Sequence, residues 1–367
     1  MKNRVVPEGI HTNPQNALAE RGFFHVGGSY VEMDGKHLMN GQMYVEVYVP
    51  MEVCNQYPLV LIHGADQSGL CWMTTPDGRP GWVDFFLEKG YVVYVVDQPA
   101  RGRSVSHREL IGQKVVFSAE DTAEVFTQQA GDFPQAGRHT QWPGAGCPGD
   151  SIFDEFYAAQ IDSIYDIEET QKLMRSAGKA LLQKIGPSIL VAHSQGGPFA
   201  WFLADDQPEL VKGIISIEPS GPPFVSAQTK KLIADENGKP LNYGISHVPL
   251  TFEPPVSSPQ ELELEQHKAP NPEWIDGYLQ KEPARQLTRL RGIPAVVMTS
   301  ESSYHAPYDY WTAAFLRQAG VDAEYLPLES IGIHGNGHMM MLEKNNLEVA
   351  AVLDDWIGTH VKHVREV

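Results

Sequence analysis

The 367-residue sequence has few cysteines, no long apolar run and few basic residues relative to acidic ones. The three cysteines, Cys54, Cys71 and Cys147, cannot form the disulfide framework of a small secreted domain, since at most one pair could form. No stretch of eighteen apolar residues occurs, so no membrane-spanning helix is predicted. The net charge of −18 argues against nucleic acid or an anionic membrane as a partner, because both need basic patches.

The composition is that of a globular protein with a buried core, with 42% hydrophobic and 20% charged residues. Short apolar, β-rich runs alternate with helical patterns, which predicts a mostly parallel sheet covered by helices on both faces. We expect an N-terminal hairpin from FFHVGGSYVEM and GQMYVEVYVP, and strands at 57–64, 91–98, 188–193, 211–218, 293–300 and 322–328. Helices are expected at 81–90, 166–185, 196–206, 309–320 and 345–361.

Two long segments break this alternation. Residues 102–165 contain a glycine-, proline- and polar-rich stretch, and residues 219–292 contain many prolines and the stretch QELELEQHK, which we expect to form a short helix. Insertions of this length in a compact domain are usually functional. We therefore predict one domain over residues 1–367, with 102–165 as a lid and 219–292 as a cap insertion.

The segment ILVAHSQGGPFA, residues 189–200, places a serine between an apolar run and a helical pattern. Residues Ala192 to Gly196 read small-x-Ser-x-Gly in a strand–turn–helix context, which is typical of a nucleophile elbow. The sharp turn of an elbow lifts the hydroxyl above the sheet and needs small neighbours, so that the backbones can approach. Ser194 is therefore the predicted nucleophile.

With these features the sequence resembles the α/β-hydrolase superfamily. LVLIHGADQSG is similar to its His-Gly segment after the third strand, and VVDQPARGRS to its D-x-x-G-x-G-x-S segment, with Ala100 in place of the first glycine. GIHGNGHMMMLEKNNLEVAAVLDDWI resembles its C-terminal Gly-His segment and last helix. More narrowly, CWMTTPDGRPGW, IEP and GNGHMMM resemble a small group of bacterial carboxylesterases whose acid is a glutamate after the sixth strand. The resemblance implies the chain order Ser–acid–His and a structural role for Asp97.

A serine hydroxyl is a poor nucleophile at neutral pH and needs an adjacent base, usually histidine. His334 and His338 both follow the last predicted strand, and we favour His338, which follows Gly337 and precedes the last helix as the resemblance implies for the base. The spacing His-x3-His occurs in metal sites on helices, but the glycines between these two indicate a loop. We therefore expect no metal and no organic cofactor. His193, beside the serine, is expected to pack under the turn.

The imidazole needs a carboxylate that holds its tautomer, and two glutamates are candidates. Glu218 ends a strand that should be buried, where an isolated charge is costly without a partner. The narrower resemblance also places the acid there. Glu301 follows the strand predicted at 293–300, where most of the superfamily keeps its acid. We prefer Glu218 and keep Glu301 as the alternative.

Attack on an ester carbonyl creates an oxyanion that needs preorganised N–H donors. The fold implies the backbone N–H groups of Gln195 and Ala65 for this role. Asp66, next in the chain, is expected to point away, because a carboxylate beside an oxyanion is unfavourable. Four apolar residues on segments near the predicted site are expected to line the substrate pocket: Trp72, Phe224, Tyr304 and Met339.

These residues predict a serine carboxylic-ester hydrolase that works through an acyl-enzyme on a small-molecule ester. The alternatives are the same triad acting on a lactone, an amide or carbamate, or a carbon–carbon bond, and a catalytically silent ligand-binding protein of the same fold. The first residues show no apolar signal-peptide region, so the default expectation is a cytoplasmic protein, with a processed, exported form as the alternative. The sequence leaves a homodimer open.

Overall fold

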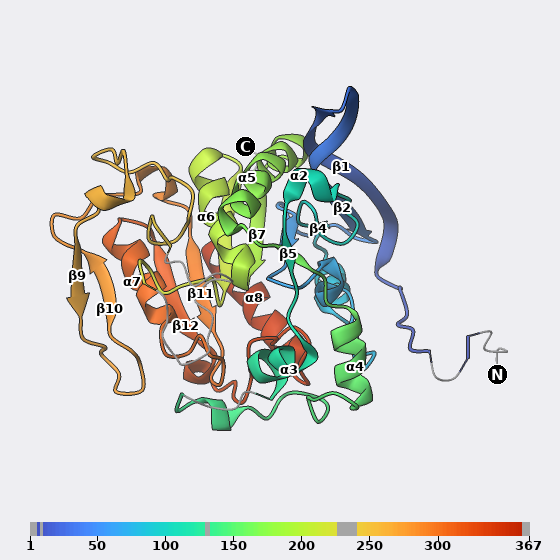
Figure 1. The fold of residues 1–367 in the computed structure, drawn as a ribbon. Coiled ribbons are helices and arrows are strands. Elements are labelled where there is room, and N and C mark those ends of the chain that lie inside the picture. The colour runs from blue at the N-terminus through green and yellow to red at the C-terminus, as the bar shows by residue number, and fades with distance from the viewer. Residues whose placement is uncertain (1–5, 8–9, 129–132, 226–240, 362–367) are drawn as a thin grey trace.

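The computed structural model describes residues 6–7, 10–128, 133–225 and 241–361. Its centre is an eight-stranded sheet with the strand order β1-β2-β4-β3-β7-β8-β11-β12 (Figure 1). β1 (Leu18–Met33) and β2 (Lys36–Pro50) form an antiparallel hairpin, and β2 also pairs antiparallel with β4. The remaining neighbours are parallel: β4 (Val93–Asp97), β3 (Leu59–Ile62), β7 (Ser188–His193), β8 (Val211–Ile217), β11 (Ala295–Thr299) and β12 (Ala323–Pro327).

Helices cover both faces of this sheet because successive strand residues point to opposite sides and nearly all of them are apolar. In β3, for example, Leu59 and Leu61 belong to one hydrophobic cluster and Val60 and Ile62 to the other. The first cluster includes side chains of α1 (Trp82–Glu88) and α8 (Asn346–His360). The second includes side chains of α5 (Ile167–Ile185), α6 (Gly197–Asp206) and α7 (Asp309–Gln318).

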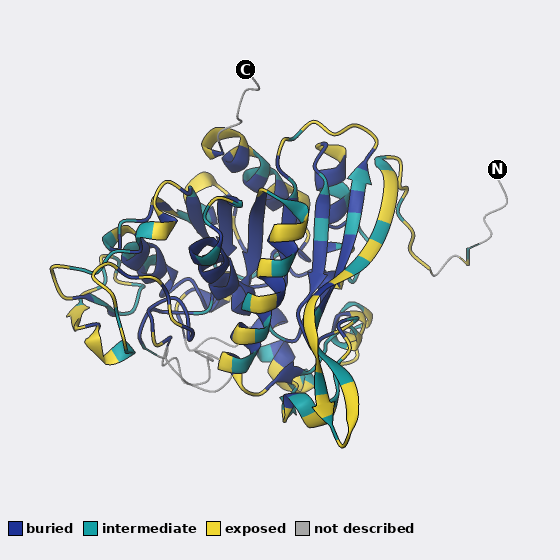
Figure 2. Ribbon diagram, turned by 90° about the horizontal axis from the view of Figure 1, so that it is seen from above, coloured by how far each residue is buried: buried dark blue, intermediate teal, exposed yellow. Residues whose placement is uncertain are grey.

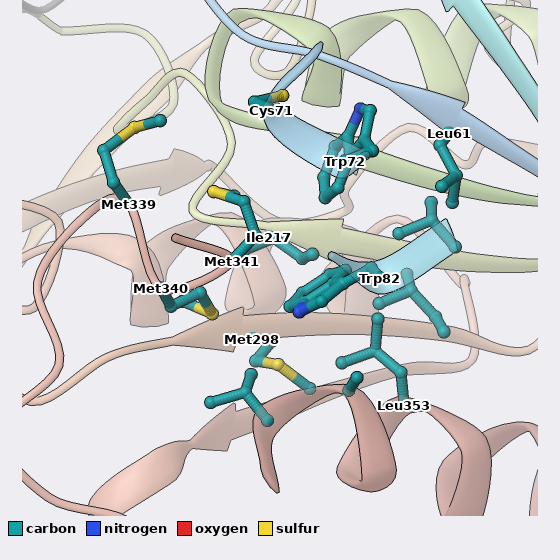
Figure 3. Close-up of a cluster of buried hydrophobic side chains, with 14 of the residues drawn as sticks. Leu61, Cys71, Trp72, Trp82, Ile217, Met298, Met339, Met340, Met341 and Leu353 are labelled. Atoms are coloured by element: carbon teal, nitrogen blue, oxygen red, sulfur yellow. The ribbon is translucent and has the colours of Figure 1, made fainter. Parts of the chain in front are cut away.

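The central strands are buried on both faces, whereas the outer strand β1 and the outward faces of the helices are exposed (Figure 2). Figure 3 shows part of the first cluster, where Trp72 and Trp82 lie 5.3 Å apart between ring centroids. The consecutive methionines Met339, Met340 and Met341 are fully buried in the same cluster. The loop after β12 is thereby anchored in the core.

The predicted strands and helices of the regular part are confirmed, with ends that differ by at most two residues. The two strands of the N-terminal hairpin are also confirmed, but each begins five residues earlier than the stretch from which it was predicted. The helix predicted at QELELEQHK is wrong: after a short 3-10 turn, Pro259–Glu261, the chain forms β9 (Leu264–His267), which pairs antiparallel with β10 (Gly277–Gln280). The alternation of leucine and glutamate in this stretch has the two-residue period of a strand. The structure of this stretch therefore follows the spacing of its apolar residues rather than the helix propensity of its residue types.

The segment 102–165 contains short elements rather than one regular unit. They are α2 (Arg108–Ile111), β5 (Lys114–Val115), α3 (Ala119–Thr122), the π-helical turn Ala123–Thr127, the 3-10 turn Ala136–Arg138, α4 (Ser151–Ala158) and β6 (Ser163–Ile164). β5 and β6 pair antiparallel, which closes the segment on itself. Among the described residues, no helix combines the length and the apolar character that crossing a membrane requires.

Candidate active site

Ser194 lies in a sharp turn between β7 and α6. Its φ angle is 55°, in the left-handed region that residues other than glycine rarely adopt. The turn requires glycine at the second and third positions after Ser194. A Cβ on Gly196 would lie 2.7 Å from the carbonyl oxygen of His63, and a Cβ on Gly197 would lie 2.4 Å from Pro219 Cβ. The local structure is therefore the strained strand-to-helix turn that the sequence predicts.

Glu218 and His338 meet at the carboxyl edge of the sheet. Glu218 directly follows β8, and its Oε2 lies 2.5 Å from Nδ1 of His338 in the loop after β12. Both side chains are fully buried. The contact places the hydrogen of His338 on Nδ1, which leaves Nε2 as an acceptor. The structure thus brings together the predicted base and the preferred acid.

Two serines that the sequence reasoning missed complete the surroundings of Glu218. The Ser300 N–H and hydroxyl donate to Oε1 at 2.8 and 2.5 Å, and the Ser303 hydroxyl donates to Oε2 at 2.6 Å. Burial raises the pKa of Glu218, while these hydrogen bonds favour its charged form and lower it. In the sequence, the only sign of a role for these two serines is that they follow β11, the strand next to β8 in the sheet.

His338 is held in the core by groups on several segments. Burial, with the nearby His305, lowers its pKa well below the ordinary value. Its backbone carbonyl oxygen lies 3.0 Å from Nε2 of His193, so His193 supports the loop from beneath the elbow. The buried carboxylate of Glu343 accepts the Gly337 N–H at 2.9 Å and fixes the residue before His338. Glu343 was also missed, because its role depends on this loop folding back.

Glu301, the alternative acid, contacts a different histidine. Its Oε2 lies 3.1 Å from Nδ1 of His334 and accepts the Gly335 N–H at 2.9 Å. The His334 side chain is 62% exposed, in contrast to the buried Glu218–His338 pair. The geometry therefore favours Glu218 over Glu301 as the partner of His338.

A small cavity of about 40 Å³ borders Ser194. Its lining also includes Ala65 and Gln195, the two residues whose N–H groups are predicted to bind the oxyanion. Gly64 allows these segments to approach each other, since a Cβ there would lie 2.8 Å from Ser194 Cβ. The remaining lining residues come mostly from the two insertions and the segment after β11: Phe117, Val125, Phe126, Ile167, Ser220, Gly221, Tyr304, His305 and Tyr308.

Tyr304 links His338 to this cavity. It lines the cavity beside Ser194, and its hydroxyl lies 3.3 Å from Nε2 of His338, to which it can donate. Phe126 stacks on the imidazole with ring centroids 5.6 Å apart. Nε2 of His338 thus contacts a residue that lines the same cavity as Ser194, and an aromatic ring from the 102–165 insertion covers the imidazole.

Of the four residues expected to line the pocket, only Tyr304 borders this cavity among the described residues. Trp72 and Met339 are fully buried in the first hydrophobic cluster (Figure 3), and Phe224 packs edge-on against Phe315 with centroids 5.2 Å apart. That expectation is corrected for these three residues. Their neighbourhood in the sequence placed them near the site, but their apolar side chains are used to fill the core behind it.

Asp66 points away from the cavity, as expected. Its carboxylate accepts the Ser163 hydroxyl at 3.2 Å, and it does not line the cavity among the described residues. Burial raises the pKa of Asp66 to about 6, against an opposing effect of the Arg101 charge. Asp97 has the structural role that the resemblance implied: it accepts the N–H groups of Gly69 and Arg103, each at 2.8 Å.

One group of three potential metal ligands occurs within the described ranges, formed by His193, Glu218 and His338. Their ligand atoms all lie within 4.8 Å of one another. However, Glu218 and His338 already bond to each other, and His193 Nε2 contacts the His338 carbonyl oxygen. These contacts form a histidine–carboxylate pair with a supporting histidine, so the three groups bond within the protein rather than facing a shared metal position.

Comparison with known proteins shows the family to which the chain belongs. A family model described as "Alpha/beta hydrolase family" matches residues 59–352. A fungal protein named "Probable secreted lipase phiG" is 44% identical over 353 residues, which cover 95% of this chain and 93% of that protein. A solved structure described as "The Atomic Resolution Structure of a Novel Bacterial Esterase" has a TM-score of 0.68 and 25% identity, covering 97% of this chain and 100% of that one.

Proposed function

Since the chain belongs to the alpha/beta hydrolase family, we propose that it is a serine hydrolase that cleaves carboxylic esters through an acyl-enzyme. The observation that carries the proposal is the buried contact of 2.5 Å between Glu218 Oε2 and His338 Nδ1, at the sheet edge where Ser194 occupies the elbow. A carboxylate in this position holds the imidazole in the tautomer that can accept a proton at Nε2.

In the proposed reaction, Ser194 Oγ attacks the ester carbonyl carbon while His338 Nε2 takes the hydroxyl proton. Glu218 stabilises the imidazolium that forms, and the N–H groups of Ala65 and Gln195 bind the oxyanion. Collapse of the tetrahedral intermediate expels the alcohol, which takes its proton from His338. Water then hydrolyses the acyl-enzyme by the same steps. Because hydrogen bonds of a catalytic serine often tighten only when substrate binds, the resting geometry is compatible with this role.

The relatives favour an ester over the other bonds that such a triad can cleave. The 44% identical protein is named a lipase and the similar solved structure an esterase, and both names describe ester hydrolysis. A lactone, an amide or carbamate and a carbon–carbon bond remain the rival substrates, to be separated by experiment. The same relative is named as secreted, which supports the exported form that the sequence kept as its alternative.

The test is the hydrolysis of a panel of p-nitrophenyl esters, from acetate to long acyl chains, by the native protein and by Ser194→Ala. We expect turnover that peaks at one chain length and is lost in the variant. Labelling of Ser194 by an alkyl p-nitrophenyl phosphonate, located by mass spectrometry, tests the nucleophile separately. Labelling without turnover of any ester would reject the ester assignment and favour one of the rival bonds. A lack of both would reject the serine mechanism.

A further inference from the structure

Arg101 is a buried arginine between the two segments that provide the predicted oxyanion donors. It follows β4, its residue is only 1% exposed, and it is among the largest fully buried side chains of the described chain. A buried guanidinium is costly unless its N–H groups are hydrogen-bonded. The hydrogen-bond partners of Arg101 therefore indicate which part of the structure this buried side chain stabilises.

Each arm of the guanidinium reaches a different oxyanion segment. One terminal nitrogen donates to the carbonyl oxygen of Gly64 at 3.1 Å. That carbonyl belongs to the peptide whose N–H is the Ala65 donor. The other terminal nitrogen donates to the side-chain oxygen of Gln195, whose backbone N–H is the second donor. One rigid, planar group thus connects both donors.

His63 strengthens the same arrangement at the Gly64 carbonyl. Its Nε2 accepts the Gln98 N–H at 3.1 Å, so the ring hydrogen is on Nδ1, which donates to the Gly64 oxygen at 2.9 Å. Burial and the Arg101 charge lower the pKa of His63 to about 4, which keeps it neutral at pH 7. Two donors on one carbonyl polarise the peptide and make its N–H a stronger donor.

We infer that Arg101 is a positioning residue for the oxyanion hole: it sets the separation of the Ala65 and Gln195 N–H groups and places a positive charge behind them. This inference rests on the proposed function, because it assumes an oxyanion at Ser194. The charge and the fixed dipoles would stabilise the transition state more than the bound ester. Loss of Arg101 should therefore lower kcat while changing KM little.

The experiment compares Arg101→Met, Arg101→Lys and the control Arg175→Met. Arg175 also joins a side chain and a carbonyl, binding Asp206 and the Pro249 oxygen, but on the helices α5 and α6 behind the sheet. The first readout is the rate at which an alkyl p-nitrophenyl phosphonate labels Ser194, since its phosphoryl oxygen takes the place of the oxyanion. The second is kcat and KM for the best p-nitrophenyl ester. Thermal unfolding establishes that each variant is folded.

We expect Arg101→Met to label, and to turn over ester, about 10- to 100-fold more slowly than the native protein, with KM little changed. Arg101→Lys keeps the charge but has a single donor nitrogen in place of the planar fork, so its rate should fall between those of Arg101→Met and the native protein. Arg175→Met should label at the native rate. If Arg101→Met does not fold, Arg101→Lys carries the test, with a slower rate expected. Native labelling rates in folded Arg101 variants would overturn the inference.

The phosphonate readout separates this inference from the ester proposal. If the native protein turns over no ester but is labelled, the ester assignment fails, and slower labelling of the Arg101 variants still supports the inference. If the native protein turns over ester and the Arg101 variants match it in both readouts, the inference fails alone. If the native protein is not labelled and hydrolyses nothing, both are rejected.

Discussion

At the scale of single residues, two glutamates follow neighbouring parallel strands, and each contacts a different histidine. Glu218 contacts the buried His338, and Glu301 contacts the exposed His334. This pair of contacts provides a matched test of the acid, because the same substitution can be made at both positions.

We expect Glu218→Gln to lower kcat by about 10²- to 10⁴-fold, because an amide facing Nδ1 favours the wrong imidazole tautomer. Glu301→Gln should keep a kcat close to that of the native protein. The measurement is steady-state hydrolysis of the best p-nitrophenyl ester by both variants. Near-normal activity of Glu218→Gln together with a large loss in Glu301→Gln would reject our assignment and restore the alternative acid.

Asp66 makes a pH-dependent contribution to the free energy of unfolding. Burial raises the pKa of its carboxyl group to about 6 in the folded protein, from an ordinary value of 3.8. The folded state therefore holds this proton over a pH range in which the unfolded chain has lost it. The contribution is fully present below pH 4 and is lost as the pH rises through about 6. Arg101 and Asp162 are the charged groups that act on it, in opposite directions.

Asp66→Asn should remove this pH dependence, because an amide can accept the Ser163 hydrogen bond without ionising. Relative to the native protein, the variant should gain up to about 3 kcal/mol of unfolding free energy between pH 4 and pH 8. Urea unfolding of both proteins at several pH values measures the gain. A difference between them that stays constant with pH would contradict the prediction.

At the scale of elements, the segment from β5 to the π-helical turn covers the cavity. Phe117, Val125 and Phe126 from this segment line it, and the β5–β6 pairing fixes the base of the segment. The lid predicted at 102–165 thus contributes side chains to the site. The cap predicted at 219–292 contributes only Ser220 and Gly221 among its described residues, and part of it, 226–240, lies outside them.

We predict that Phe117→Ala enlarges the cavity and shifts the preference toward longer acyl chains. The reason is that the benzyl group of Phe117 occupies space beside Ser194 that an acyl chain could take. The measurement is the ratio of kcat/KM for octanoate and acetate p-nitrophenyl esters. Phe224→Ala is the control: it should lower the unfolding free energy by about 3–5 kcal/mol without changing that ratio. An unchanged ratio in Phe117→Ala would argue that this segment does not limit the acyl group.

At the scale of the whole molecule, the three cysteines are free and differ in accessibility. Cys54 is exposed, Cys147 is intermediate and Cys71 is buried, and burial raises the pKa of the Cys71 thiol well above its ordinary value. Because the thiolate is the reactive form, Cys71 is protected both sterically and electrostatically. It lies in the first hydrophobic cluster with Trp72 and is only 5% exposed, so neighbouring side chains shield most of it from solvent (Figure 3).

Iodoacetamide should therefore modify Cys54 rapidly in the native protein and Cys71 only as the protein unfolds. Mass spectrometry of each cysteine over a urea gradient measures this. The urea midpoint for modification of Cys71 should coincide with the midpoint of unfolding measured by tryptophan fluorescence, as two probes of one cooperative transition do. A reducing agent should leave the midpoint unchanged. Rapid modification of Cys71 without urea would show that this part of the core opens on its own.

The extent to which the sequence predicts the site follows from how local each signal is. The elbow at Ser194 is a strand, a turn and a helix in consecutive residues, so its pattern is complete in a short window. Glu218 and Glu301 both end strands at the same sheet edge, and sequence could rank but not separate them. Trp72 and Met339 are close in sequence to site residues, yet side-chain direction places them in the core.

The sequence by itself determined the alternation of strands and helices, the elbow serine and the histidine after the last strand, because periodicity and turn chemistry act between near neighbours. Only the tertiary structure decided which glutamate meets His338, which aromatic rings line the cavity, and that Arg101 joins both predicted oxyanion segments. These contacts join residues that are far apart in the chain. They depend on how the loops pack at one edge of the sheet, which no local pattern records.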